Sequence, residues 1–313
     1  MSHSLIVALS VVFPMAAYML IGVACRRGGI IDRSTMKRFD VLAFKLFLSV
    51  SLFKNIYSAD YSGGFSLKLV LAACLGASLL YVFSRYFIGR CEKDANKAAS
   101  LSVSLFRSNY SLFGLAVAQS LFGEDNAGAV SLLAAIIVPL TSVYSVIVFE
   151  ENRSKKTNLL KTTAAVLKNP LIIASLLAIL LKLIHFEIPE LLFGVIKSIA
   201  SAATPLCFIS LGVGLNLEEM HANSRILTIS VLLKMVLIPA VMVTLSVLLG
   251  FRGQELCALM IAFAAPTAVN VYPMAISMEA DGPTAAQMVA LTTIVSIFSI
   301  FLITFILTSL NYF

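Results

Sequence analysis

The chain has 313 residues, of which 59% are hydrophobic and only 12% are charged. Soluble domains carry about 25% charged residues, so this composition excludes an ordinary soluble protein and indicates a chain that lies largely in a membrane. The five cysteines form no CxxC pair, which argues against a disulfide framework and against a zinc site.

Ten apolar stretches are each long enough to cross a bilayer as a helix, which takes about 20 residues. Their predicted limits are 4–25, 38–57, 65–84, 98–122, 127–149, 163–184, 191–216, 226–250, 253–278 and 284–310. No basic region precedes the first stretch, so we expect a retained span rather than a cleaved signal peptide. The sequence therefore predicts an all-α integral membrane protein with ten transmembrane helices.

Lysine and arginine are concentrated in alternate loops between these stretches. Fifteen of them lie in or beside the loops after the first, third, fifth and seventh stretches, whereas the loops on the opposite side hold only Arg252. The positive-inside rule places the basic loops in the cytoplasm and both termini on the extracytoplasmic side of the cell membrane. A nucleic-acid partner would not require this alternation, so we expect none despite the net charge of +7.

Ten spans with both ends outside divide into two halves of five, and an odd number of spans per half makes the halves oppositely oriented. We expect a first five-helix repeat at 1–150, a cytosolic linker at 151–162 and a second, inverted repeat at 163–313. The segment Ser142 to Val146 has a similar counterpart in Ser296 to Ile300. The loop after the first stretch holds five basic residues and its counterpart at 185–190 holds none, as opposite faces require.

Two spans are interrupted at matching places in the two halves, the fourth from Phe106 to Gly114 and the ninth from Ala264 to Pro273. Broken helices at membrane depth are tolerated where they are buried in protein or line a watery cavity. A pair of them in corresponding positions of two halves points to the binding site of a secondary transporter. We expect Gly114, Pro266 and Pro273 to shape these helix breaks.

The polar residues at the two breaks are the candidate substrate-binding residues. Asn109 and Asn270 can donate to a carboxylate or accept from a cation, and we expect them to share one site; alternatively, they satisfy the broken backbone. The other candidates are Arg107, Ser108, Tyr110, Ser111, Thr267 and Tyr272. The alternative for each serine or threonine is a bond to its own helix. Helix amino termini at the breaks would add partial positive charge and free N–H groups.

Four basic residues, Lys45, Arg107, Lys197 and Lys234, lie inside apolar spans, and no acidic residue lies comparably deep. A charge at the centre of a membrane helix costs about 2.5–3.5 kcal/mol, which makes it a functional candidate. The three lysines can extend to the headgroups, whereas we expect Arg107 to face the cavity or to hold broken-helix carbonyls. Asp40 lies near a cytosolic helix end. Cations without a deep carboxylate favour an anionic substrate.

Several short motifs follow one another along the chain. They are Pro14 with Gly22, Arg107 to Tyr110 with Gly114, Asn169-Pro170, Pro205 to Gly212, and Pro266 to Ala275 followed by Asp281-Gly282. Together they resemble the bacterial members of the auxin efflux carrier (AEC) family, which lack a long cytosolic domain. The resemblance covers essentially the whole chain. One departure is Leu48 to Ser51, where the family often has a proline.

The resemblance implies a fold similar to that of sodium/proton antiporters and bile-acid symporters. Spans 1, 2, 6 and 7 would form a scaffold, spans 3–5 and 8–10 a mobile transport domain, and spans 4 and 9 would cross as broken helices. It also implies a homodimer formed through the scaffold. The small residues from Ser198 to Ala203 would offer the transport domain a smooth surface.

The leading prediction is a secondary-active or facilitative carrier of small organic anions, such as mono- or dicarboxylates, that works by elevator-type alternating access. The alternative is a cation-coupled or cation/proton antiporter on the same fold. An enzyme is not indicated, because the sequence has no HExxH, no GxSxG and no intramembrane aspartate pair, and a P-loop is also absent. We expect the organic anion and the lipid bilayer as partners and no cofactor, and coupling to protons or sodium stays open.

Overall fold

The computed structural model describes residues 2–59, 66–123, 128–154, 159–215, 220 and 223–313. Throughout these ranges the regular structure is helical, and the single β-type pairing among them is an isolated antiparallel bridge between Ser108 and Thr267. The prediction of an all-α chain is confirmed.

Each predicted span corresponds to one helix or to a run of consecutive helices. The first half contains α1 (Ser2–Arg27), α2 (Arg33–Leu42), the π-helix η1 (Ala43–Leu48), α3 (Ser49–Tyr57), α4 (Leu67–Cys91), α5 (Ala95–Phe106), α6 (Tyr110–Phe122) and α7 (Gly128–Ser154). The second half contains α8 (Leu159–Lys168), α9 (Pro170–Leu183), α10 (Glu190–Gly214), α12 (Ser224–Leu232), the π-helix η3 (Leu233–Leu237), α13 (Ile238–Leu248), α14 (Gly253–Ala264), α15 (Val271–Ser277) and α16 (Gly282–Ser309). Among the described residues, five segments are long and apolar enough to cross a membrane without interruption, namely Leu67–Cys91, Gly128–Arg153, Glu190–Gly214, Ser224–Leu248 and Gly282–Ser309.

Side-chain caps explain several of the helix starts. Asp94 caps α5 by accepting the backbone N–H groups of Asn96 and Lys97, and Asp281 caps α16 by accepting that of Thr284. Asn169 caps α9 in the same way, and Pro170 takes the first helical position, where a missing N–H group leaves no bond unmade. The predicted sixth span is therefore divided into α8 and α9 at Asn169.

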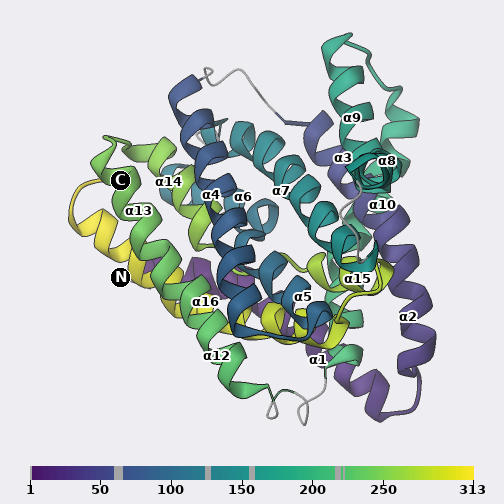
Figure 1. Cartoon of the computed structure of the whole chain (residues 1–313). Helices are drawn as coiled ribbons and strands as arrows, with labels where there is room; N and C mark the ends of the chain where they lie inside the picture. Colours follow the sequence, from purple (N-terminus) through teal and green to yellow (C-terminus); the bar gives the residue numbers. More distant parts are fainter. Residues whose placement is uncertain (1, 60–65, 124–127, 155–158, 216–219, 221–222) are drawn as a thin grey trace.

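The helices pack in two groups that meet along one interface (Figure 1). In one group α10 lies against α1 and α3, and α9 packs on α3. In the other group α4, α5 and α7 pack together, and α14 packs on α6, α7 and α13. The groups meet where α16 and α6 contact α1 and where α15 contacts α2.

Loops that were predicted on the same side of the membrane lie near one another. On the predicted cytoplasmic side the Lys97 ammonium donates to the Asn223 side chain over 3.0 Å, so the loops before α5 and before α12 are neighbours. At the opposite end the rings of Phe122 and Phe313 pack with 5.9 Å between their centroids. The two termini lie on the same side of the helix bundle in Figure 1.

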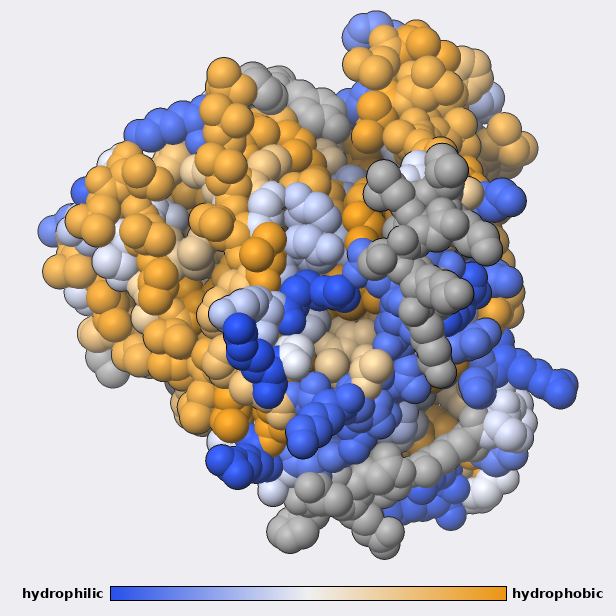
Figure 2. Space-filling model, viewed as in Figure 1, coloured by the Kyte–Doolittle hydropathy of each residue, from blue (hydrophilic) through white to orange (hydrophobic). Residues whose placement is uncertain are grey.

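Large apolar side chains cover much of the outer surface. On α4, Leu71, Leu75 and Leu79 are 51%, 63% and 66% exposed, and their four-residue spacing puts them on one helix face. Figure 2 shows hydrophobic residues over much of the visible surface and hydrophilic ones gathered in its lower part. An apolar surface of this extent is stable against lipid rather than water, as in an integral membrane protein.

Candidate functional site

The two interrupted spans cross at their unwound segments, 107–109 between α5 and α6 and 265–270 between α14 and α15. The Asn109 N–H donates to the Pro266 carbonyl over 2.7 Å, and the Ala268 N–H donates to the Arg107 carbonyl over 3.0 Å. These bonds flank the bridge between Ser108 and Thr267. Backbone groups in a membrane need internal partners, and here each break supplies partners to the other.

Two hydroxyl groups tie the crossing to the ends of the preceding helices in a reciprocal pattern. The Ser108 hydroxyl donates to the Ala262 carbonyl over 2.7 Å, and the Thr267 hydroxyl donates to the Ser104 carbonyl over 2.9 Å. Each accepting carbonyl lies two residues before the end of a broken helix, α14 in the first case and α5 in the second. Both hydroxyls therefore bind backbone, and they bind the other half's helix rather than their own.

Arg107 connects the first break to the second and to α7. Its guanidinium is buried, with 1% of the residue exposed. The Nε atom donates to Asn270 Oδ1 over 2.9 Å, and Nη1 donates to the Ser145 hydroxyl over 3.1 Å. The guanidinium thus donates to side chains in the second break and on α7. Neither of these bonds is to a carbonyl of a broken helix.

A cavity of about 80 Å³ lies beside the crossing. The breaks and the first turn of α6 contribute six of the candidate residues to its lining, namely Arg107, Ser108, Asn109, Tyr110, Ser111 and Asn270. Ser51 and Asn55 from α3 and Thr204 from α10 line it from the other helix group. Asn109 and Asn270 therefore lie on the wall of one cavity although they are far apart in the sequence.

Three polar atoms of the lining residues are buried and have no hydrogen-bond partner among the described residues. They are Nη2 of Arg107, Nδ2 of Asn109 and the hydroxyl of Tyr110. Asn109 precedes α6, and its side chain makes no capping bond to that helix. All three atoms can donate a hydrogen bond.

Five other predicted site residues lie outside the cavity lining. Thr267 is fully buried and holds the crossing, and Pro266 lies in the second break and accepts the Asn109 N–H. Gly114 lies inside α6, beyond the first break, where a Cβ would meet the Val130 side chain at 3.0 Å. Pro273 belongs to the first turn of α15, and Tyr272 points toward α10, where its hydroxyl lies 2.2 Å from the position of a Cβ added to Gly214.

Asp40 was not predicted as a site residue, and the structure buries it, with 1% exposed. Its Oδ1 accepts a hydrogen bond from the Ser210 hydroxyl of α10, and the Tyr272 hydroxyl of α15 lies beside the carboxyl. The sequence carried a signal, because Met36 and Phe44 lie four residues to either side on the same helical face and are also buried. Asp40 therefore lies where α2 and α10 meet α15 rather than at an exposed helix end.

Lys234 does not extend to the headgroups as the sequence suggested. It is fully buried in η3, and its ammonium donates to the Leu105 carbonyl over 2.9 Å and to the Ser108 oxygen over 2.8 Å. Lys45 and Lys197, in contrast, are exposed. Two deep cations, Arg107 and Lys234, therefore reach the crossing.

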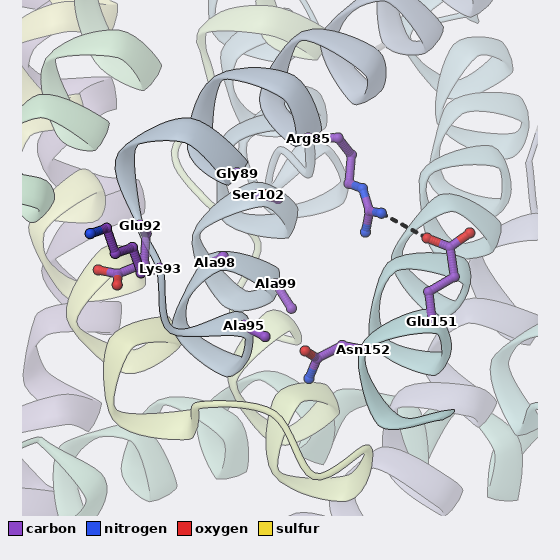
Figure 3. Close-up of a pocket in the computed structure, with 10 residues that line it drawn as sticks. All are labelled: Arg85, Gly89, Glu92, Lys93, Ala95, Ala98, Ala99, Ser102, Glu151 and Asn152. Atoms are coloured by element: carbon purple, nitrogen blue, oxygen red, sulfur yellow. Dashed lines mark hydrogen bonds and ion pairs between the residues drawn. The ribbon is translucent and has the colours of Figure 1, made fainter. Parts of the chain in front are cut away.

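A larger cavity of about 580 Å³ opens near the start of α5, between α4 and α7. Figure 3 shows Arg85 and Glu151 reaching toward one another beside it, and this ion pair measures 2.8 Å. The α5 side of the cavity is formed mainly by small residues, Ala95, Ala98, Ala99 and Ser102. Among the described residues, none of its lining side chains has a buried polar atom without a partner. The crossing is therefore the stronger candidate for a binding site.

Comparison with known proteins identifies the family. A family model described as membrane transport protein matches residues 7–304. An uncharacterised transporter of the archaeon Methanocaldococcus jannaschii is 27% identical over 260 residues, which cover 80% of this chain and 81% of that protein. An uncharacterised transporter of Methanothermobacter thermautotrophicus is 25% identical over 276 residues, or 86% of this chain and 87% of that protein. The chain is thus a membrane transporter and belongs to the membrane transport protein family, which includes the auxin efflux carriers, as its motifs predicted.

Proposed function

We propose that this transporter carries small organic anions with a carboxylate group and binds them in the cavity at the crossing. The observation that carries the proposal is that three residues lining one cavity, Arg107, Asn109 and Tyr110, each have a buried donor atom without an acceptor among the described residues. A buried donor without an acceptor costs about 1–3 kcal/mol. A carboxylate accepts several hydrogen bonds at once, so an anion bound in the cavity would offer acceptors to the donors of Arg107 and Asn109.

The charge of the lining favours an anion over a cation. Among the described residues that line the cavity, Arg107 is the only charged one and none is acidic. The first turn of α6, a helix of 13 residues, also lines the cavity. The amino terminus of a helix carries about half a positive charge. A carboxylate that leaves water needs compensation of several kcal/mol. Hydrogen bonds to charged groups contribute about 1.5–3 kcal/mol each, so the guanidinium, the amide and the helix end together match that cost.

The size of the cavity favours a small substrate. A cavity needs about 10–15 Å³ to hold one water molecule. The cavity of about 80 Å³ therefore admits a molecule of about six groups of that size. That is the size of a mono- or dicarboxylate with few carbon atoms. Ser51, Asn55 and Thr204 would contact it from the side of α3 and α10.

We further propose an elevator mechanism on a ten-helix inverted repeat. In it, α4–α7 and α12–α16 carry the crossing and its anion past a scaffold of α1–α3 and α8–α10. The position of the cavity supports this, because the crossing forms one wall while α3 and α10 supply the other. The reciprocal bonds of Ser108 and Thr267 support the repeat, because each half provides the same kind of contact to the other.

Binding of a carboxylate panel to the purified full-length chain, measured by calorimetry, tests the proposed function. The substitution Arg107→Gln should weaken binding at least tenfold, or about 1.4 kcal/mol, and Arg107→Glu should eliminate it. Lys45→Gln is the matched control, because Lys45 also lies inside a predicted span but has an exposed side chain. Thermal unfolding shows whether each variant folds. Retained carboxylate binding by a folded Arg107→Glu variant, or transport of cations alone, would refute the proposal.

Cation-coupled transport is a second candidate, and the position of Asp40 favours it. Its carboxyl is buried at the contact between α2, α10 and α15, with Ser210, Tyr272 and the Cys207 thiol as neighbours. The ion pairs of the described residues do not include Asp40. Asp40→Asn preserves the size of the side chain. If anion binding persists while the pH dependence of uptake disappears, Asp40 carries a coupled proton; unchanged pH dependence would exclude this role.

A further inference from the structure

Lys234 supplies a positive charge to a backbone group that the first helix break leaves without its helical partner. In a continuous helix the Asn109 N–H would donate to the Leu105 carbonyl. At the crossing this N–H donates to Pro266 instead, and the Lys234 ammonium donates to the Leu105 carbonyl over 2.9 Å. The side chain thus completes the carboxyl end of α5, where the helix dipole favours a cation.

Both hydrogen-bond acceptors of the Lys234 ammonium are oxygen atoms. The Ser108 hydroxyl uses its own proton in the bond to the Ala262 carbonyl, so its oxygen accepts from Lys234 over 2.8 Å. A backbone carbonyl at the end of a half-helix and a hydroxyl oxygen are hard ligands of the kind that bind alkali and alkaline-earth cations. In secondary transporters with broken helices, such half-helix ends coordinate the coupling cation.

A π-helical turn brings the lysine inward. Lys234 is the second residue of η3, and π-helical turns inside α-helices are frequent at functional sites. Leu233, Lys234 and Met235 are all buried, whereas Leu232 and Val236, on either side, are 54% and 55% exposed. The segment therefore presents apolar side chains outward and its one charge inward.

We propose that the Lys234 ammonium is a tethered cation that takes the place of a coupling sodium ion at the crossing, so that the transporter binds its anion without sodium. This inference rests on the proposed function of the cavity, since it concerns the ion requirement of the same site. Ser108 connects the two features, because it contacts Lys234 and also lines the cavity. Lys234 and Arg107 together place two positive charges at the first break.

The test compares sodium with choline at equal ionic strength, using the purified full-length chain. Carboxylate affinity of the unmodified protein should be equal in the two salts within about twofold. Lys234→Ala removes the tethered cation and opens room beside the Leu105 carbonyl. This variant should bind the anion at least tenfold more weakly in choline, and sodium should restore much of the lost affinity.

Lys197→Ala is the matched control, because Lys197 also lies in an apolar helix but is exposed, with its ammonium 4.7 Å from the Phe193 ring centre. It should bind the anion like the unmodified protein in both salts. A merely structural role of Lys234 would lower stability in both salts equally, so the rescue by sodium separates the two roles.

Thermal unfolding provides a readout that needs no anion, because a ligand that binds the native state raises its stability. Sodium should raise the unfolding temperature of Lys234→Ala and leave that of the unmodified protein unchanged. If the variant does not fold, the test uses the unmodified protein alone. The inference is overturned if the unmodified protein requires sodium to bind the anion, or if sodium raises its unfolding temperature. Absence of carboxylate binding in either salt would instead refute the proposed function, while the sodium response of the unfolding temperature would still test Lys234.

Discussion

The contact between α1 and α10 depends on two facing glycines, and the structure predicts what a methyl group would do there. A Cβ added to Gly212 would lie 2.1 Å from the Met19 carbonyl oxygen, and one added to Gly22 would lie 2.0 Å from the Ile209 carbonyl oxygen. Both obstacles are backbone atoms, which cannot rotate away. Since ordinary carbon–oxygen contacts exceed 3 Å, either alanine would push the two helices about 1 Å apart.

The expected cost follows from two opposing terms. Overpacking of a tight contact costs about 1–3 kcal/mol, and a clash with rigid backbone belongs at the upper end of that range. Replacing glycine by alanine inside a helix gains about 0.5–1 kcal/mol. Gly212→Ala should therefore destabilise the protein by about 2 kcal/mol. At about 2–4 °C per kcal/mol, thermal unfolding of the purified protein in detergent should show a fall of about 4–8 °C.

Gly194→Ala is the matched control, because Gly194 lies in the same helix and its Cβ would meet nothing within 4 Å. This variant should keep or raise the unfolding temperature. The double variant of Gly22 and Gly212 should cost less than the sum of the single ones, because helices already parted by one methyl group accommodate the second. An unfolding temperature of Gly212→Ala equal to that of Gly194→Ala would refute the reasoning.

Three further predictions concern the site, the topology and the start of α2. Asn270→Asp places a carboxylate where Arg107 Nε now finds an amide oxygen, so it should weaken anion binding more than Asn270→Ala does; calorimetry that ranks them in reverse contradicts the anion assignment. A single cysteine at exposed Lys93, in a cysteine-free chain, should react with a membrane-impermeant reagent only after cells are opened, and labelling of intact cells would invert the topology. Asp32 accepts hydrogen bonds from Ser34 and Thr35, which lower its pKa from 3.8 to about 2. Because this pKa is depressed in the folded state, the cap should stabilise α2 above about pH 4 and fail as pH falls toward 2. Hydrogen exchange at the start of α2 should accelerate over that interval, and exchange independent of pH after correction for the intrinsic rate would count against the cap.

The sequence predicted helices and helix breaks where these left a local signal. Apolar length set the spans, and the polar runs around Asn109 and Asn270 marked the two breaks. Gly114 and Pro273 were less informative, because both residue types also serve inside helices. Gly114 allows α6 to approach Val130, and Pro273 sits in a first turn where its missing N–H leaves no bond unmade.

The structure brings some of the candidate binding residues together and places others elsewhere. Arg107, Asn109 and Asn270 line one cavity, whereas Thr267 and Tyr272 point elsewhere. An unwound segment has no helical period, so its sequence does not reveal which side chain faces which way. Only the pairing of the two breaks, by contacts between residues far apart in the chain, fixes those directions.

Asp40 and Lys234 were assessed by their depth in a span, and depth was the wrong criterion. Lys234 lies in a π-helical turn, which changes the face on which a side chain emerges, and hydropathy carries no signal for such a turn. Asp40 shares a buried face with its apolar neighbours, and its bond to Ser210 depends on a helix far along the chain. Both residues are buried through tertiary contacts rather than through local sequence.

The break itself explains why positive charge gathers at the crossing. Interrupting one helix creates a carboxyl end at Phe106 and an amino end at Tyr110, and their partial charges have opposite signs. The negative end of α5 is met by the Lys234 ammonium through the Leu105 carbonyl. The positive end of α6 lines the cavity together with Arg107, and none of the described residues in that lining is acidic. The Lys234 ammonium thus compensates the negative end of α5, and the positive end of α6 is complementary to an anion.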